Sequence, residues 1–250
     1  MTDDPLVPPA DLIFDGSTSP AKFKSIGEGF TRHFLLEHAK LKPHEKVLDV
    51  GCGIGQKARP LTTYLSEQGS YDGFDIVALG IDWCAEKYKP YPNFRFQLAD
   101  VYSAHYNPRG TYKASDYKFP YGDNTFDLVL LSSVFTHMLP QDMENYFAEL
   151  GRVLRPAGRC VITFFLLNPE SRNRINLGLN TIKIPFVYQT EACYVASLAS
   201  LETTVAHDEA YVRSLYEKNG LSLTEVTYGS WCGRQEFLGC LQDVLIAMKT

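Results

Sequence analysis

The feature that most constrains the fold is a short apolar run that ends in three closely spaced glycines. Residues 47–50 read Val-Leu-Asp-Val, and residues 51–55 read Gly-Cys-Gly-Ile-Gly. An apolar run of this length is typical of a buried strand in a parallel sheet, and glycine permits the positive φ angles of a tight turn. Residues 56–68 then suit a helix. The pattern predicts a strand, a turn and a helix whose exposed N-terminus favours a nucleotide-like ligand.

The same alternation continues along the chain and predicts an α/β fold with a doubly wound, Rossmann-like and mainly parallel sheet. A C-terminal pair of strands with a short connection is expected to be antiparallel. The predicted strands are 46–50, 71–77, 94–98, 126–131, 159–167, 221–228 and 240–248. The predicted helices are 21–40, 56–68, 83–89, 141–153 and 208–219.

Two segments do not follow this alternation of strands and helices. Residues 102–123 form a long loop with five tyrosines, and loops of that length inside a domain are usually functional or flexible. Residues 168–207 are irregular, and we predict a short helix within them over 192–201. We therefore predict one domain over 1–250, with an N-terminal helical cap over 1–45 and a lid or substrate insertion over 168–207.

The composition of the chain excludes several classes of protein. The chain has 250 residues, of which 45% are hydrophobic and 21% charged, as in ordinary globular domains. A net charge of −5 argues against nucleic acid as a partner. The longest mostly apolar run, 160–167, is far shorter than the ~20 residues that span a bilayer. The acidic, proline-rich start is unlike a signal peptide.

Six cysteines occur without any C-x-x-C pair, which gives no support for a zinc site and favours reduced thiols. We therefore predict a cytoplasmic protein that uses neither metal nor membrane, and we leave its oligomeric state open.

The glycine spacing distinguishes between nucleotide ligands. It is G-x-G-x-G, and Gln56 occupies the place of the third glycine in the dinucleotide fingerprint. The acid at Asp49 suits an amine-bearing ligand better than a phosphate. Asp75 ends the second predicted strand, where an acid can bind both hydroxyls of a ribose. An NAD(P)-dependent oxidoreductase shares this strand, turn and acid, and stays an alternative.

The motifs that follow resemble, in order, those of class I S-adenosylmethionine-dependent methyltransferases. Residues 49–55 resemble the family's glycine motif, 73–76 its ribose-binding strand end and 97–101 its adenine-binding segment. Residues 119–129 resemble the lead into its fourth strand, and 150–159 the turn before its fifth. The loop 102–118 is longer than this family usually shows, so its role does not transfer.

The resemblance implies S-adenosylmethionine as cofactor and assigns residues to its parts. Gly51, Gly53 and Gly55 would pass beneath the methionine part, with Asp49 holding its amino group directly or through water. The backbone near Ser132 would line the sulfonium.

The resemblance assigns the adenosine end in the same way. Asp75 would bind the ribose, and Ile76 would pack on the adenine face. Asp100 would accept a hydrogen bond from the adenine amine, with Val101 donating through its backbone.

His137 is the candidate general base, because it lies at the expected reaction face and titrates near neutrality. A histidine there also serves in other proteins to cap a helix or contact the cofactor, so both roles stay open. The other histidines are expected to be surface or structural, with His105 undecided. Candidate acceptor-binding aromatic residues, for which core packing is an equally good explanation, are Phe135, Phe165, Tyr188 and Trp231.

The acceptor is predicted to be a small molecule methylated on an O or N atom. A protein or RNA acceptor is an alternative, as is a fold member that binds the cofactor without turnover. The sequence does not name the acceptor.

Overall fold

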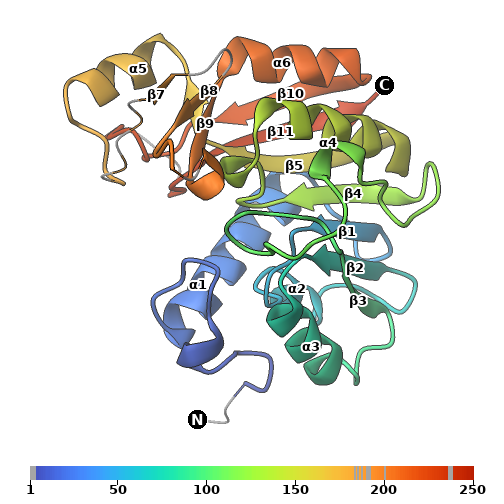
Figure 1. Ribbon diagram of the computed structural model, residues 1–250. Coiled ribbons are helices and arrows are strands. Elements are labelled where there is room, and N and C mark those ends of the chain that lie inside the picture. Colours follow the sequence, from blue (N-terminus) through green and yellow to red (C-terminus); the bar gives the residue numbers. More distant parts are fainter. Residues whose placement is uncertain are drawn as a thin grey trace.

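The structure is a computed structural model that describes residues 4–182, 184, 186, 188–189, 193–199, 201–235 and 239–250. Its described part contains a seven-stranded sheet flanked by helices and a four-stranded sheet that lies to one side (Figure 1).

The seven-stranded sheet has the order β10-β11-β5-β4-β1-β2-β3. Strands β1 to β5 pair in parallel, and β11 is antiparallel to both β5 and β10. The predicted parallel sheet and antiparallel C-terminal pair are confirmed. The strand order reverses between β1 and β4, which marks the usual ligand position in such sheets. The strands are β1 (Lys46–Val50), β2 (Ser70–Asp75), β3 (Phe94–Leu98), β4 (Phe126–Leu131), β5 (Leu154–Phe164), β10 (Leu221–Thr227) and β11 (Asp243–Lys249).

Helices follow the predicted positions, with three differences. The helix expected over 83–89 begins earlier, at Ala78, and ends at Lys87. The helix expected over 21–40 divides into α1 and the π-helix η2, and the one expected over 56–68 is only the four-residue α2. The turn residues 51–57 precede α2, and three glycines with positive φ keep them out of helical geometry. The helices beside the large sheet are α1 (Pro20–Phe30), η2 (Thr31–His38), α2 (Ala58–Leu61), α3 (Ala78–Lys87), α4 (Pro140–Val153) and α6 (Glu209–Lys218).

Each face of the large sheet has its own apolar core. Leu48 and Val50 of β1 pack with α4 and α6, whereas Val47 packs with η2, α2 and α3. Successive strand residues point to opposite faces, so a strand covered on both sides is apolar throughout. All six residues of β4 are accordingly buried.

The segment after β5 differs most from the prediction. Residues 193–195 of the helix expected over 192–201 form a strand, and positions 192 and 200 lie outside the described residues. The four-stranded sheet has the order β6-β9-β8-β7. Cross-strand pairing, which depends on distant residues, decides this conformation. Its strands are β6 (Leu166–Leu167), β7 (Tyr188–Gln189), β8 (Cys193–Val195) and β9 (Val205–Asp208).

Helix α5 (Pro169–Asn176) was not predicted from the sequence. The Asn168 side chain accepts a hydrogen bond from Ser171 N, and Pro169 occupies the first helical position. Asn followed by Pro is a local signal for the start of a helix, so the sequence itself contains the evidence for α5. Figure 1 shows α5 and its sheet on the same side of the large sheet as α1.

Candidate functional site

A cavity of about 1210 Å³ lies at the carboxyl ends of the parallel strands. Its floor includes Gly51 and Gly53 after β1, Ile76 after β2, Val101 after β3 and Ser132 after β4. Residues of α1 and η2 line one side, and residues from the segment after β5 line another. The cavity therefore occupies the position at which doubly wound sheets bind ligands.

The glycine turn leaves room for a ligand. Gly53 has a φ of 57°, and no atom of the described residues lies within 4 Å of the place where a Cβ would stand. At Gly51, with a φ of 77°, a Cβ would come within 2.5 Å of Val134 Cγ2. Both glycines line the cavity, whereas Gly55 packs behind the turn against Tyr88 and Cys84. A side chain at 53 would thus fill the space that a cofactor needs.

Asp49 provides an unused acceptor beside this turn. Its side chain lines the cavity but is only 1% exposed, and Oδ2 accepts a hydrogen bond of 2.6 Å from Tyr71 Oη. Oδ1 is buried and has no partner among the described residues. Burial raises the pKa of this carboxyl to about 6, although Tyr71 and Lys57 act in the opposite direction. An unpaired buried acceptor is costly, so the site fits a ligand that brings a donor.

Asp75 ties the glycine turn to the end of β2. Its Oδ2 accepts from Gly53 N at 2.7 Å, and its Oδ1 accepts from Val77 N at 2.8 Å. Burial raises the pKa of Asp75, and these backbone donors oppose the rise. A carboxylate has about four acceptor positions, so each oxygen keeps capacity for a hydroxyl of a ligand.

Asp100 is not part of the cavity wall. Its side chain is exposed, and Thr111 N lies 3.3 Å from Oδ1. Its carbonyl oxygen accepts from the backbone N–H groups of Thr111 and Tyr112. The long loop after β3 folds back onto Asp100, and it is Val101 and Tyr102 that line the cavity. Asp100 itself does not line the cavity, and the contact of its side chain with adenine stays a prediction.

His137 lies in the short helix η4 (Phe135–His137) and lines the cavity. Its Nδ1 is 3.2 Å from the carbonyl oxygen of Glu202, which can only accept, so Nδ1 carries the proton and the lone pair is on Nε2. Burial lowers the pKa of His137, which keeps the ring neutral near pH 7. The Tyr106 ring meets the imidazole edge-on at 5.3 Å.

Glu202 joins the two irregular segments above the cavity. Its Oε2 accepts from Ala104 N at 3.0 Å, and Ser103 Oγ lies 3.3 Å away. The long loop is further held by Asn145, whose Nδ2 donates to Ala114 O at 2.8 Å. The loop therefore has defined contacts on both of its flanks.

The four candidate aromatic residues take different positions. Phe165 lines the cavity, but Phe135 is fully buried, with ring centroids 5.3 Å from Phe147 and 5.4 Å from Phe164. Three apolar rings pack best together in the core, so the predicted contact of Phe135 with the acceptor is corrected.

Trp231 and Tyr188 also lie outside the cavity wall. Trp231 is fully buried behind Phe165, at a centroid distance of 5.2 Å, and its Nε1 donates to Asp243 Oδ2 at 2.7 Å. Tyr188 lies in β7 and is 40% exposed. Trp231 supports the cavity wall from behind, so its predicted contact with the acceptor is corrected. Tyr188 does not line the cavity either, and its contact with an acceptor stays a prediction.

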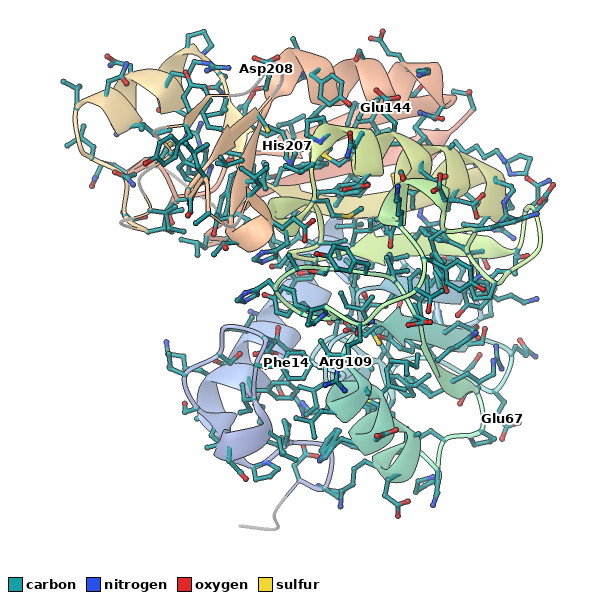
Figure 2. All side chains as sticks on the ribbon, viewed as in Figure 1. Phe14, Glu67, Arg109, Glu144, His207 and Asp208 are labelled. Carbon is teal, nitrogen blue, oxygen red and sulfur yellow. The ribbon has the colours of Figure 1, made fainter. Side chains whose placement is uncertain are left out.

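Several cavity residues were not identified from the sequence. Phe14 reaches between α1 and α3 (Figure 2) and approaches Gly80. Lys57 and Glu202 also line the cavity, as does His33, whose Nδ1 is 3.2 Å from Glu37 Oε2. They come from loops, or from a helix with no motif, so no local pattern marks them.

His207 has the structural role that was expected of it. It is fully buried (Figure 2), and its Nε2 donates to the carbonyl oxygen of Phe135 at 2.8 Å. Burial lowers the pKa of His207 to about 4, so the ring is neutral at pH 7.

Comparisons with known proteins identify the domain. Residues 48–162 match the family described as a methyltransferase domain. The chain is 28% identical over 141 residues to a sterol 24-C-methyltransferase of Gibberella zeae, covering 53% of this chain and 32% of that protein. It is 31% identical over 153 residues to phosphoethanolamine N-methyltransferase 3 of Arabidopsis thaliana, covering 58% of this chain and 27% of that protein. The chain thus spans less than half the length of these relatives.

Solved structures agree on the fold. A SAM-dependent methyltransferase from Methanosarcina mazei superimposes with a TM-score of 0.58 at 19% identity, covering 86% of this chain and 97% of that one. The predicted Rossmann-like fold is thereby confirmed, and the methyltransferase-domain match over residues 48–162 agrees with the resemblance to class I S-adenosylmethionine-dependent methyltransferases. No helix among the described residues has the length and apolar character of a membrane span.

Proposed function

The chain carries a methyltransferase domain, and on this basis we propose that it transfers the methyl group of S-adenosylmethionine to an O or N atom of a small molecule. The observation that carries the proposal is the cavity in which Asp49, Gly53 and Asp75 converge. The three supply an unpaired acceptor, an open backbone surface and a carboxylate with spare acceptor capacity.

These residues suit the cofactor part by part. The cofactor supplies a methyl group that is already activated on a sulfonium. Gly51 and Gly53 would pass beneath its methionine part, and Asp75 would accept from its ribose hydroxyls. Ile76 and Val101 would border the adenine, and Ser132 would lie near the sulfonium. The protein then has to align the acceptor and exclude water.

His137 is the residue proposed to remove a proton from the acceptor. The hydrogen bond from Nδ1 to Glu202 O fixes the tautomer and leaves Nε2 as a base. Because burial lowers the pKa, the base form is present at neutral pH without any activating carboxylate. This role favours acceptors with a transferable O–H or N–H proton.

The size and lining of the cavity favour a small organic acceptor. At about 1210 Å³ it exceeds the ~300–1000 Å³ typical of a site for one small molecule, which suits a cofactor together with an acceptor. Apolar side chains from both sides, among them Ile26, Phe165 and Ile184, face this space. We propose that the segments 1–45 and 168–207 act as cap and lid over it. A cytoplasmic location stays a prediction from the sequence.

Calorimetric titration of the purified protein with S-adenosylmethionine, S-adenosylhomocysteine, NAD and NADP tests the cofactor. We expect micromolar binding of the first two and none of the nicotinamide nucleotides, because Gln56 replaces the third glycine of the dinucleotide fingerprint. Binding of NAD or NADP alone would overturn the proposal and restore the oxidoreductase alternative.

Asp75→Ala should weaken S-adenosylhomocysteine binding by about 1–3 kcal/mol, because charge-assisted hydrogen bonds to the ribose are lost. This loss of binding free energy also contains the effect of any shift of the glycine turn, because Gly53 N loses its acceptor in the variant. Calorimetry measures the affinity, and circular dichroism checks the fold. Asp82→Ala, an exposed acid on α3, is the matched control and should bind as the wild type does. Unchanged affinity of a folded Asp75→Ala protein contradicts the ribose assignment.

A further inference from the structure

The wall of the cavity around His137 is acidic. Glu202 and Asp142 both line the cavity, and the carbonyl oxygen of Glu202 lies 3.2 Å from His137 Nδ1. Among the described residues neither carboxylate has an ion-pair partner. His105 influences His137 electrostatically, but it is exposed and does not line the cavity. Carboxylates that are partly withdrawn from water gain from a cationic partner, so this wall favours a ligand with positive charge.

The fold brings the two carboxylates together from distant segments. Glu202 Oε2 accepts from Ala104 N at 3.0 Å, and Asp142 lies in the first turn of α4. Leu139 and Leu201, which lie shortly before these acids in the chain, pack against the same buried cluster. Burial raises the pKa of Asp142, and the negative charge of Glu202 raises it further. The two acids therefore repel each other, and a cation beside them would relieve that repulsion.

Thr136 is an independent sign that a ligand belongs at this wall. Its side chain is 1% exposed, and the residue lines the cavity. Its Oγ1 is buried and has no hydrogen-bond partner among the described residues. It precedes His137 in η4, so the unpaired hydroxyl belongs to the neighbour of the candidate base. A buried hydroxyl without a partner is costly, and its oxygen can accept a hydrogen bond from an N–H group of a ligand.

Two tyrosines belong to the same wall. The rings of Tyr106 and His137 meet edge-on with their centroids 5.3 Å apart. Tyr146 follows Asp142 by one turn of α4, so the two residues share a face of that helix. Both tyrosines line the cavity, and aromatic rings attract cations through their faces. Carboxylates, a hydroxyl oxygen and aromatic rings thus gather at one end of the cavity, and each of them interacts better with an ammonium group than with a neutral hydroxyl.

We propose that the methyl acceptor is an amine, which binds as its ammonium ion against Glu202 and Asp142. This rests on the proposed function and narrows it from an O or N atom to a nitrogen atom. Nε2 of His137 takes one proton from the ammonium group, which frees a lone pair on nitrogen. The lone pair forms the bond to the methyl carbon, while the C–S bond breaks and its electrons stay on sulfur. The products are the methylated ammonium ion and S-adenosylhomocysteine, and the proton on Nε2 passes to solvent.

Pairs of ligands that differ only in an amine or a hydroxyl group test this inference by binding. The pairs are hexylamine with 1-hexanol and 2-phenylethylamine with 2-phenylethanol. Each ligand is titrated by isothermal calorimetry into the full chain saturated with S-adenosylhomocysteine. We expect the amine to bind about 10- to 100-fold more tightly than the alcohol in at least one pair, as charge-assisted hydrogen bonds predict. A preference below about tenfold in both pairs, which includes the absence of binding, overturns the inference.

Glu202→Gln and Asp142→Asn should each reduce the amine preference about tenfold, because each removes one negative charge and keeps the shape of the side chain. Glu202→Gln retains the carbonyl oxygen that orients His137 and an acceptor for Ala104 N, so alcohol binding should be unchanged. An equal loss for amine and alcohol in both variants would show that the acids only support the wall, and overturns the inference. Glu144→Gln, an exposed acid on α4 (Figure 2), is the matched control and should keep the wild-type preference.

The same titrations distinguish this inference from the proposed function itself. Binding of S-adenosylhomocysteine to the wild-type protein is measured first, and its absence overturns both. If S-adenosylhomocysteine binds and both variants keep the full amine preference, the two carboxylates do not recognise the acceptor. That result overturns the inference and leaves the cofactor assignment intact.

Discussion

His137→Gln should lower kcat by about 10²- to 10⁴-fold on an acceptor that must lose a proton, the range that positioned acid–base groups contribute. Glutamine keeps a polar side chain but cannot take up the proton. Nδ1 of His137 is occupied by its hydrogen bond to the carbonyl oxygen of Glu202, which also orients the ring. The proton from the acceptor must therefore be taken up by Nε2. The measurement is the formation of S-adenosylhomocysteine with an acceptor found by screening small phenols, alcohols and amines.

The pH profile separates a base from a residue that only shapes the cavity. Burial lowers the pKa of His137 from 6.5, so the neutral, active form predominates above that lowered value. The kcat/KM of the wild type should therefore rise with pH in the acidic range, with a midpoint below the ordinary histidine pKa of 6.5, and then level off. In His137→Gln this rise should be absent, while His44→Gln, an exposed histidine, should keep it. A variant with reduced activity but an unchanged acidic limb would exclude His137 as the base.

Asp243→Ala should reduce the free energy of unfolding by about 3–5 kcal/mol, because it removes the buried counter-charge of Arg234, which then keeps only the more exposed Glu170. Asp243 is fully buried at the start of β11, and Arg234 Nη1 donates to its Oδ1 at 3.0 Å. Leu166 N and Gly229 N, both at 2.8 Å, and Trp231 Nε1 at 2.7 Å also donate to this carboxylate. The alanine variant removes the carboxylate that all four donors share, and of the four Arg234 Nη1 keeps a second acceptor in the carbonyl oxygen of Gly229.

Urea unfolding followed by circular dichroism measures this loss. The control is Glu86→Ala, which removes an exposed ion pair with Lys89 and should leave the unfolding midpoint unchanged. An Asp243→Ala protein with nearly wild-type stability would show that the hydrogen bonds and the ion pair of Asp243 contribute little to the free energy of unfolding. Trp231 packs behind Phe165, which lines the cavity. The variant should therefore weaken acceptor binding more than it weakens cofactor binding.

Much of the cofactor end of the cavity could be predicted from the sequence. Val47, Leu48 and Val50 are buried on alternating faces as a strand requires, and Gly51 and Gly53 adopt the positive φ angles for which glycine is suited. Asp49 and Asp75 stand at the ends of adjacent strands, so the parallel pairing of β1 with β2 brings them to the same edge. The roles of these residues toward the cofactor stay predictions for the binding experiments.

The acceptor end could not be predicted in the same way. Phe135 and Phe165 look alike in sequence, yet one is stacked in the core and the other lines the cavity. The strand at 193–195 forms because it pairs with β9, a partner some ten residues further along the chain.

The sequence by itself determined the parallel sheet, the glycine turn and the acids beside it, because these depend on hydrophobic periodicity and on the conformations open to single residues. Only the tertiary structure decided which side chains face the cavity beyond the strand ends. It brought Glu202 to His137, and among the described residues it left Oδ1 of the buried Asp49 without a hydrogen-bond partner. Contacts between distant segments depend on packing and burial in three dimensions, which no local pattern encodes.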